Sequence, residues 1–241
     1  AFRADLCQIY TDVDGVYTTD PRIVPNARKL DEITYDEMLE LASQGAGVLH
    51  NPSGGLAKKF RVDLEVLSSL ERKPGTKVKE VTKVEKTTIA GVAKDTSIAR
   101  VALIGLQHNP GVAFQVFDLL SKHNINVDII LQSIGREDTK DISFTVHKKD
   151  LEDAESILNE NKEALRFDHI ETDSHIGKVS IVGAGLMTNC GMAARMFEAL
   201  YEAGINIQMI NTSEIRVSVL LDEDDIDLAV RAIHAKFFDD I

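Results

Sequence analysis

Hydrophobic positions recur in the same order in two long segments of the chain, residues 99–133 and 177–213. Each segment has an apolar run, a glycine-bearing turn, and a second apolar run that follows Ile-Asn. Between the runs, apolar residues fall at i, i+3, i+4 and i+7, which is one face of a helix. These residues are Ala113, Val116, Phe117 and Leu120 in the first copy and Ala193, Met196, Phe197 and Leu200 in the second. An internal repeat of strand, turn, helix and strand is therefore the unit of this architecture.

The pattern after each copy extends the repeat. A third strand and a second helix are expected in both copies, and a final strand is expected only in the first. The ranges are 142–146, 150–162 and 167–172 in the first copy, and 215–221 and 224–237 in the second. This order, β-α-β-β-α-β, is the ferredoxin-like plan. The second copy lacks its last strand, and the apolar residues 89–93, upstream of the first copy, are the candidate to complete that sheet.

The first eighty residues follow a different pattern. Residues 6–10 predict a strand that leads into the turn TDVDG. Thr34 and Glu37 form a capping box, so a helix is expected to run to about Gln44. Strands are expected at 62–68 and 77–81, and the polar stretch 82–88 is a candidate boundary.

Composition and charge narrow the class of protein. A hydrophobic fraction of 44% and a charged fraction of 27% are typical of a globular chain. The net charge of −12, with dispersed basic residues, argues against nucleic acid as a partner. No apolar run approaches the roughly 18–20 residues that span a bilayer, so no membrane is expected. Cys7 and Cys190 are far apart, which fits a reduced, cytoplasmic chain, and the histidines show no metal-ligand spacing, so no metal site is expected.

Several long motifs resemble a known family. The turn Asn109-Pro110-Gly111 and the strands INVDIILQS and INIQMINTSEIRVSVL resemble the tandem ACT domains of aspartate kinases. Independently, residues 10–22, YTDVDGVYTTDPR, resemble the nucleotide-contacting loop of the same enzymes, which have the amino-acid kinase fold. The stretches YDEMLELASQGAGVLH and AKKF, the strand LEV and the turn PGT follow in the family's order. The resemblance covers essentially the whole chain.

The resemblance implies an α/β (α+β) chain in which a remnant of the amino-acid kinase fold is followed by two ferredoxin-like ACT units. The first ACT unit is expected to be inserted in the second, as the spare strand also indicates. The implied domains are 1–81 for the kinase remnant, 98–173 for ACT unit 1, and 83–97 with 174–241 for ACT unit 2.

Two departures from the family bear on catalysis. The family's N-terminal lobe, which holds the phosphate-binding start and the aspartate-binding residues, has no counterpart here, and the chain opens without Met, as a truncated or processed chain would. Gly47 stands where the family usually has a lysine that contacts ATP. The stretch from Asn51 to Gly55 also differs from the usual Arg-Ser-Val-Glu pattern. The changes at Gly47 and in the stretch from Asn51 to Gly55 argue against nucleotide binding by this chain.

The loop after the first strand carries side chains suited to a nucleotide. Thr11 and Asp12 offer a hydroxyl and a carboxylate at the C-terminal end of a strand, where α/β sheets place ligands. Tyr17 offers a flat ring, and Arg22 offers a guanidinium for phosphate oxygens. On residue types alone a plain turn is the stronger reading, whereas the resemblance implies that these four residues are nucleotide-contacting by ancestry.

An amino-acid effector presents a carboxylate and an ammonium group, and the first repeat offers a partner for each. Residues 108–113 are expected to begin a helix whose N–H groups bind the carboxylate, with Pro110 in its first turn. Asn126, Asp128 and Gln132 are expected on one face of the next strand, because they are two and four positions apart. Asp128 can then bind the ammonium group of the effector.

The resemblance implies a set of effector contacts in both repeats. In the first repeat they are His108, Asn109, Pro110, Gly111, Val112, Ala113, Asn126, Val127, Asp128 and Gln132. In the second they are Met192, Ala193, Asn206, Ile207, Ser213 and Glu214. Asp128 has the neutral Gln208 as its counterpart, so we expect one cation-preferring site and one different site. Without the resemblance, Asn126 and Asn206 fit a loop-capping role equally well, and Asp128 fits a solvated carboxylate.

The function implied is that of the regulatory part of an aspartate kinase, which senses lysine, threonine or both by feedback. The intact enzyme would use ATP with Mg²⁺ to phosphorylate the β-carboxylate of aspartate, while this chain alone is expected to be inactive and to hold no cofactor. A homo-oligomer through the ACT units is also expected. Two alternatives stay open: a dimerisation module without ligand binding, and a competent kinase whose missing lobe comes from another chain.

Overall fold

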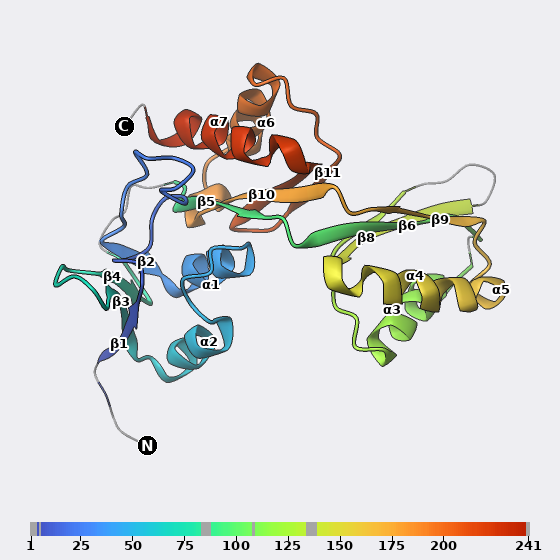
Figure 1. Cartoon of the computed structure of the whole chain (residues 1–241), viewed down its shortest axis with the longest axis horizontal. Coiled ribbons are helices and arrows are strands. Elements are labelled where there is room, and N and C mark those ends of the chain that lie inside the picture. Colours follow the sequence, from blue (N-terminus) through green and yellow to red (C-terminus); the bar gives the residue numbers. More distant parts are fainter. Residues whose placement is uncertain (1–3, 5, 83–87, 108, 134–138, 240–241) are drawn as a thin grey trace. The chain divides into compact units, whose positions relative to one another are not determined.

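The computed structural model describes residues 4, 6–82, 88–107, 109–133 and 139–239 (Figure 1). The chain divides into two compact units, which we describe separately. One unit comprises Ala1–Asp95 together with Lys178–Ile241, and the other comprises Thr96–Gly177. Within the described ranges, no helix is both long enough and apolar enough to cross a membrane.

A small kinase-like module occupies the first part of the larger unit. Its sheet has the strand order β1-β3-β4-β2, in which β1 pairs parallel with β3, β2 pairs parallel with β4, and β3 and β4 are antiparallel. The elements are β1 (Leu6–Thr11), β2 (Glu32–Thr34), α1 (Tyr35–Ser43), α2 (Asn51–Phe60), β3 (Asp63–Ser68) and β4 (Thr76–Lys79). The three strands and the helix expected here are present, whereas β2 and α2 were not anticipated from the sequence pattern.

Helix α1 begins and ends where its local sequence predicts. The side chain of Thr34 accepts a hydrogen bond from the backbone N–H of Glu37, and the Glu37 carboxylate accepts one from the backbone N–H of Thr34. This reciprocal capping box satisfies two N–H groups that a helix N-terminus otherwise leaves unpaired. At the other end, Gln44 is the C-cap and Gly45 has a φ of +108°, a conformation that favours glycine.

The second repeat completes the larger unit. Its elements are β5 (Gly91–Asp95), β10 (Ile176–Val182), the 3₁₀ turn η2 (Ala184–Met187), α6 (Met192–Glu202), β11 (Met209–Thr212), β12 (Arg216–Asp222), the 3₁₀ turn η3 (Glu223–Asp225) and α7 (Ile226–Phe238). The strand order is β11-β12-β10-β5, and β5 pairs antiparallel with β10. The spare strand upstream of the first repeat therefore does complete this sheet, two residues later than predicted.

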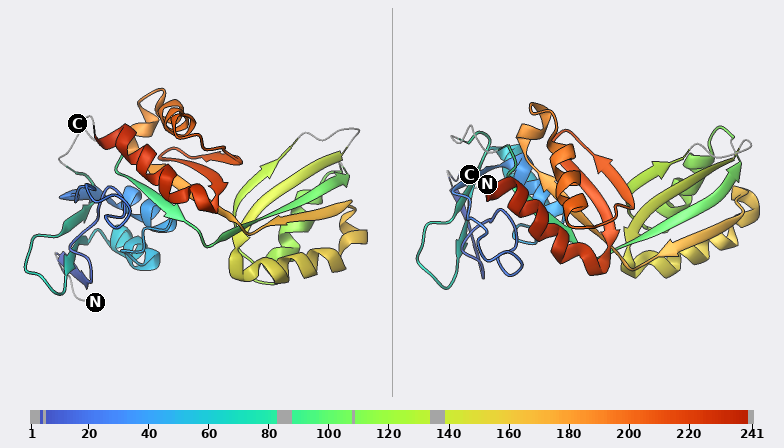
Figure 2. Two further views of the ribbon diagram at one scale, coloured as in Figure 1. Left: turned by 45° about the horizontal axis from the view of Figure 1, so that its top comes forward. Right: turned by 90° about the horizontal axis from the view of Figure 1, so that it is seen from above.

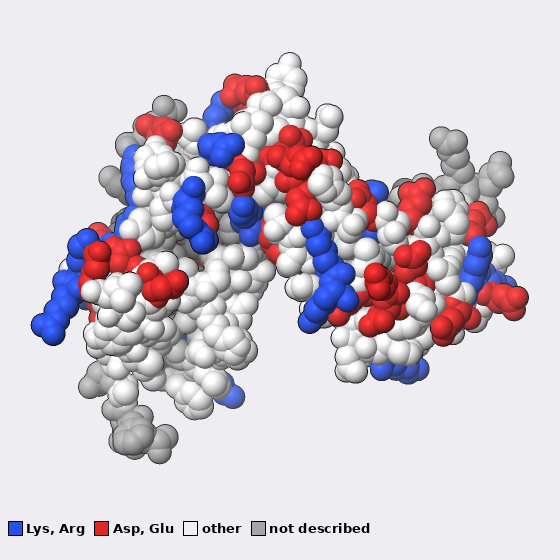
Figure 3. All heavy atoms as spheres, viewed as in Figure 1, with Lys and Arg blue, Asp and Glu red and all other residues white. Residues whose placement is uncertain are grey.

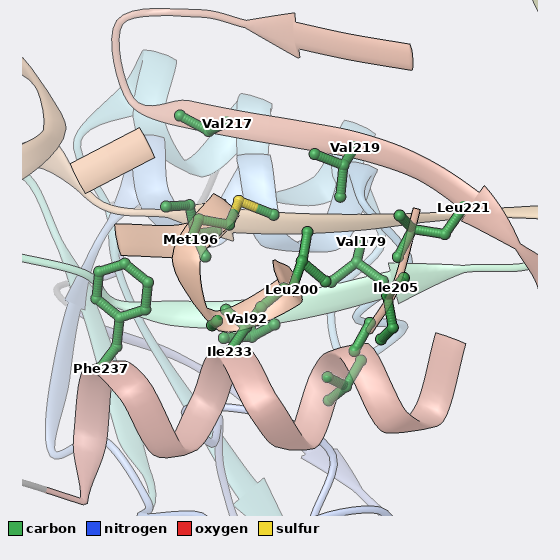
Figure 4. Close-up of a cluster of buried hydrophobic side chains, with 14 of the residues drawn as sticks. Val92, Val179, Met196, Leu200, Ile205, Val217, Val219, Leu221, Ile233 and Phe237 are labelled. Atoms are coloured by element: carbon green, nitrogen blue, oxygen red, sulfur yellow. The ribbon is translucent and has the colours of Figure 1, made fainter. Parts of the chain in front are cut away.

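Both faces of the second repeat's sheet are covered. Side chains of α6 and α7 pack on one face, where Val92, Val179 and Val219 meet Leu200 and Ile233 (Figure 4). Helix α1 of the kinase-like module lies on the opposite face (Figure 1), where Ala90, Ala93 and Val182 join the core formed by Met38 and Leu41. This double cover explains why every residue of β10 is buried.

The first repeat forms the smaller unit, Thr96–Gly177. Its elements are β6 (Ile98–Gln107), α3 (Val112–Lys122), β7 (Val127–Gln132), β8 (Thr139–His147), the 3₁₀ turn η1 (Lys148–Asp150), α4 (Leu151–Glu160), α5 (Lys162–Leu165) and β9 (His169–Asp173). The strand order is β7-β8-β6-β9, and the helices lie on one face of the sheet (Figure 2). The core includes Val101, Val116, Phe144 and Leu158. The first repeat is thus inserted between β5 and β10 of the second, and the predicted fold class is confirmed.

Candidate functional site

The end of β1 and the loop that follows it contain all four residues predicted to contact a nucleotide. Thr11 is the last residue of β1, and its hydroxyl donates to the Asp12 carboxylate at 3.0 Å. The Tyr17 hydroxyl donates to Asp14 Oδ1 at 2.8 Å. This hydrogen bond lowers the pKa of Asp14 and raises the pKa of Tyr17, because it stabilises the carboxylate and the neutral phenol. The Tyr17 hydroxyl is therefore already paired within the loop.

Arg22 is paired within the same loop. Its Nε lies 3.0 Å from Asp20 Oδ1 and its Nη2 lies 2.7 Å from Asp20 Oδ2, a two-pronged ion pair. The neighbouring carboxylate raises the pKa of Arg22, although the arginine side chain is 89% exposed. A phosphate at this position has to compete with Asp20 for the guanidinium.

Gly47 lies between α1 and α2, where the family usually has a lysine. A Cβ atom built at this glycine meets nothing within 4 Å. The backbone here therefore leaves room for a side chain at this position.

The helix predicted to bind the effector carboxylate begins later than expected. Helix α3 starts at Val112, and Gly111 is its N-cap with a φ of +92°. Pro110 therefore precedes the N-cap instead of lying in the first turn, so that prediction is wrong. The left-handed conformation at Gly111 turns the chain into the helix one residue after the proline. His108 lies outside the described residues, and Ala113 is in the first turn.

A pocket of about 170 Å³ opens beside the start of α3. Three predicted effector residues line it, and so do residues that the sequence analysis missed. The lining consists of Gln107, Asn109, Pro110, Val112, Gln115, Ala164, Leu165 and Arg166. The Arg166 guanidinium donates a hydrogen bond to Gln107 Oε1 at 3.3 Å. Because Arg166 lines the pocket, its guanidinium can bind the carboxylate of a ligand there. Arg166 lies more than thirty positions beyond the end of the repeated segment 99–133, and no local pattern pointed to it.

In the first repeat, Gln132 does not lie on the same face of β7 as Asp128, contrary to the prediction, and Asn126 precedes this strand. Val127 pairs with Val146 and Gln132 pairs with Ile142, and both partners point into the core of this unit. Gln132 lies five positions after Val127, an odd step that would put the two side chains on opposite faces of a regular strand. The alternation of faces is therefore interrupted between them. The cause is a register shift between Val127 and Ile130, where β7 holds one residue more than β8. Asp128 is exposed and lies within this irregularity, and the even spacing to Gln132 no longer places the two side chains together.

The predicted contacts of the second repeat fall into two groups. Met192 and Ala193 begin α6, whose N-cap Gly191 has a φ of +89°, and Asn206 and Ile207 precede β11. The other group, Ser213 and Glu214, forms the turn between β11 and β12, and the backbone N–H of Ser213 donates to the carbonyl of Arg216 at 2.8 Å.

The second group lines a larger pocket, of about 550 Å³, within the larger unit. The second repeat contributes two segments to this lining, and the kinase-like module contributes the rest. The lining consists of Thr34, Asp36, Glu37, Glu80, Ala184, Met187, Ser213, Glu214 and Ile215. Four carboxyl groups lie in this lining, which favours a cationic group as a ligand.

The net charge of the chain also favours a cationic ligand. Asp and Glu number 39 against 27 Lys and Arg. On the face shown in Figure 3, basic side chains are scattered among acidic ones. The net field of the molecule therefore favours the approach of cations over anions.

A buried histidine joins the kinase-like module to α7. His234 is 1% exposed, its Nε2 lies 2.9 Å from Thr18 Oγ1, and its ring stacks on Phe238 with centroids 4.7 Å apart. The backbone N–H of Arg28 donates to Thr18 Oγ1, which leaves the hydroxyl proton for a neutral imidazole nitrogen. Burial lowers the pKa of His234, and the Arg28 charge acts in the same direction, against an opposing contribution from Asp239.

We therefore expect the stability of the larger unit to fall as the pH drops below the ordinary histidine pKa of 6.5. In that range the unfolded histidine binds a proton that the folded one rejects, so protonation favours unfolding, by at most about 1.4 kcal/mol per pH unit. Above this range both states are neutral and the contribution vanishes. Unfolding titrations between pH 7.5 and 5 should show a steeper loss in the wild type than in His234→Gln. His123→Gln, at an exposed histidine, serves as the control, and an equal slope in all three proteins would contradict the prediction.

Comparison with known proteins follows the two-part architecture. The model of the amino acid kinase family matches residues 1–67, and the model of the ACT domain matches residues 101–161 and 179–237. An aspartate kinase of Pseudomonas putida is 47% identical over 98% of this chain and 58% of its own length. Aspartokinase 2 of Bacillus subtilis is 48% identical, again over 98% of this chain and 58% of its own length. The chain thus spans under three fifths of the length of these relatives.

Two solved structures extend the comparison. The regulatory subunit of aspartate kinase from Thermus thermophilus is 36% identical with a TM-score of 0.59, over 62% of this chain and 99% of that one. Aspartokinase III of Escherichia coli, in complex with lysine and aspartate, is 29% identical with a TM-score of 0.79, over 98% of this chain and 52% of that one. The chain therefore belongs to the aspartate kinase family, in which it corresponds to the end of the amino-acid kinase domain followed by tandem ACT domains.

Proposed function

We propose that this chain is the regulatory part of an aspartate kinase and that it binds lysine, threonine or both as feedback effectors. The observation that carries the proposal is the acidic pocket beside Ser213 and Glu214, at the junction of the second ACT repeat and the kinase-like module. An effector in this position touches both the sensing repeat and the catalytic fold. The intact enzyme would transfer the γ-phosphoryl group of ATP to the β-carboxylate of aspartate, the first step toward lysine, threonine and methionine.

The chemistry of the two pockets supports amino acids as ligands. The acidic pocket offers Asp36, Glu80 and Glu214 to an ammonium group. The pocket of the first repeat offers Arg166 and the start of α3 to a carboxylate. The E. coli neighbour is in complex with lysine and aspartate, and the match to it covers 98% of this chain.

The chain alone is proposed to be unable to phosphorylate aspartate. Phosphoryl transfer depends on positioning and on stabilising charge at the transferring group. In the loop after β1, Tyr17 and Arg22 are paired with neighbouring carboxylates. Gly47, between α1 and α2, supplies no cation. Aspartyl phosphate trapped with hydroxylamine, or ADP release in a coupled assay, should stay at background; product above background would contradict this proposal.

A dimerisation module without a ligand is the second candidate. Strands β7 and β11 are at the edges of their sheets and carry exposed apolar side chains, Ile130 and Leu131 on β7 and Ile210 on β11. Edge strands of this kind pair readily with a second copy. Both candidates predict an oligomer, so oligomerisation alone does not separate them.

Calorimetric titration with lysine and with threonine, alongside sedimentation at micromolar concentration, distinguishes the candidates. Heat that saturates with one of these amino acids, but not with leucine as a control, supports the sensor. An oligomer that binds neither lysine nor threonine supports the dimerisation module. A strictly monomeric chain would contradict the expected homo-oligomer.

A further inference from the structure

Helix α1 of the kinase-like module presents three polar side chains to the second repeat. Glu37, Glu40 and Gln44 are three, four and seven residues apart, so they lie on one face of the helix. Glu37 Oε1 accepts a hydrogen bond from the backbone N–H of Ala184 at 3.0 Å. Glu40 Oε1 lies 3.0 Å from a guanidinium nitrogen of Arg216. Each of these contacts joins two modules that are far apart in the sequence.

The third contact lies on the covered face of the sheet. Gln44 is buried, and its Oε1 accepts a hydrogen bond from the Ser180 hydroxyl at 3.2 Å. Ser180 on β10 is in turn 2.7 Å from the Ser218 hydroxyl on β12. Helix α1 is therefore hydrogen-bonded to two central strands of the second repeat as well as to its loops.

Glu37 serves two helix termini with one carboxylate. Its Oε2 accepts hydrogen bonds from the hydroxyl of Thr34 at 2.7 Å and from the backbone N–H of Thr34 at 3.3 Å, which caps α1. Its Oε1 binds the first N–H of the 3₁₀ turn η2. The side chain is only 8% exposed, so few alternative partners are available to it. A displacement of Ala184 therefore changes the capping of α1 directly.

Both walls that the second repeat gives to the acidic pocket are tied to this helix. Ala184 and Met187 form one wall, and Glu37 holds its first residue. Ser213 and Glu214 form the other wall, and the neighbouring Arg216 binds both Glu40 on α1 and Asn211 on β11, the latter at 2.7 Å. A ligand in the pocket thus lies against groups whose positions are set by α1.

We propose that α1 transmits the occupancy of this pocket to the kinase-like module, and that Glu37 is the positioning residue of the coupling. The inference rests on the proposed function and adds to it the route by which effector binding reaches the catalytic fold. In this route a ligand that moves the η2 turn or the β11–β12 turn alters the carboxylate that caps α1. The reverse also holds, since coupling between two sites is reciprocal.

Hydrogen exchange of the full chain, with and without saturating lysine or threonine, tests the coupling. In the wild type, the effector should change exchange both at 184–187 and in the first turn of α1. In Glu37→Ala the effector should still change exchange at 184–187, while the change in α1 falls to background. Glu37→Gln should restore the response only in part, because its single amide oxygen can accept from Thr34 or from Ala184 but cannot replace both carboxylate oxygens. Ser43→Ala is the matched control, since Ser43 lies on the same helix outside the pocket lining and its hydroxyl donates to the carbonyl of Leu39 in that helix.

A second pair of variants tests the link without any effector. Ala184→Pro removes the N–H that binds Glu37, and proline is tolerated at the first position of a helical turn. It should raise exchange in the first turn of α1 about fivefold, as expected for a weakened cap. Glu37→Ala should raise exchange at 185–187, and the double variant should add little to either single one.

The outcomes separate the two proposals. If neither amino acid binds the wild type, the proposed function fails, while the Ala184→Pro measurement still decides whether the loop and α1 are coupled. If an effector binds and α1 exchange does not respond, or if Ala184→Pro leaves α1 unchanged, the inference is overturned.

Discussion

Gly45→Ala is expected to lower the free energy of unfolding of the larger unit by roughly 3 kcal/mol. Gly45 has a φ of +108°, which a residue with a Cβ adopts only under strain. A Cβ atom at this position would also lie 2.0 Å from the backbone carbonyl oxygen of Lys94 in β5. Backbone atoms of a paired strand cannot yield as a flexible side chain can, so α1 and β5 would have to separate.

Gly47→Ala is the matched control for this substitution. It lies two residues further along the same segment, and its Cβ would meet nothing within 4 Å. We expect no loss at this position, and a gain of up to about 1 kcal/mol from reduced freedom of the unfolded chain. Guanidinium unfolding followed by hydrogen exchange at β5 reports on the correct unit, since two units can unfold separately. Equal stability of the two variants would contradict the close packing of α1 on the second repeat.

Asp128→Ala is expected to weaken lysine binding roughly ten- to a hundredfold. Asp128 is the carboxylate of the first repeat's INVD motif, and a charge-assisted hydrogen bond to an ammonium group contributes roughly 1.5–3 kcal/mol. Threonine carries no second cation, so its binding should change less if Asp128 serves the lysine side chain. Calorimetric titration of both amino acids measures the difference.

The control for this prediction is Asp118→Ala. Asp118 is a carboxylate of the same repeat, on α3, and it pairs with Lys122 one turn away. Its replacement should leave the affinity for lysine unchanged. Equal losses for lysine and threonine in Asp128→Ala would assign Asp128 to the α-amino group, and unchanged lysine binding would remove it from the site.

Features governed by neighbours in sequence were predictable. The Thr34–Glu37 capping box located α1, because both partners lie within one turn. The matching order of apolar positions predicted two copies of one fold. Counting the strands in each copy predicted that a strand upstream of the first copy, β5, completes the sheet of the second, where it pairs with β10. In these cases local spacing carries the structural information.

Helix α2 shows where local information fails. Its sequence, NPSGGLAKKF, contains a proline and two adjacent glycines, which indicate a turn. The proline is at the start of the helix, where it is tolerated, and Gly54 is buried where a Cβ would lie 2.8 Å from the side chains of Leu39 and Leu49. Close packing against those leucines favours glycine here and offsets its low helix propensity.

The candidate site was hidden for a similar reason. The register shift in β7 is set by its pairing with β8, which the sequence of β7 alone does not contain. Arg166 reaches its pocket from outside the predicted motifs, and Glu37 was predicted as a helix-capping residue and not as part of a pocket. The repeat located the loops of the site, whereas the charged side chains that complete it come from tertiary neighbours.

The insertion of the first repeat has a consequence for how such chains can be rebuilt. The inserted segment leaves the host sheet after Asp95 and returns at Lys178, and these two residues are direct partners in the antiparallel ladder between β5 and β10. Antiparallel strands need as few as two residues to join them. The entire inserted segment can therefore be exchanged for another domain, or for a short hairpin turn, at a single junction. Gene rearrangements that replace the inserted repeat need not disturb the fold of its host.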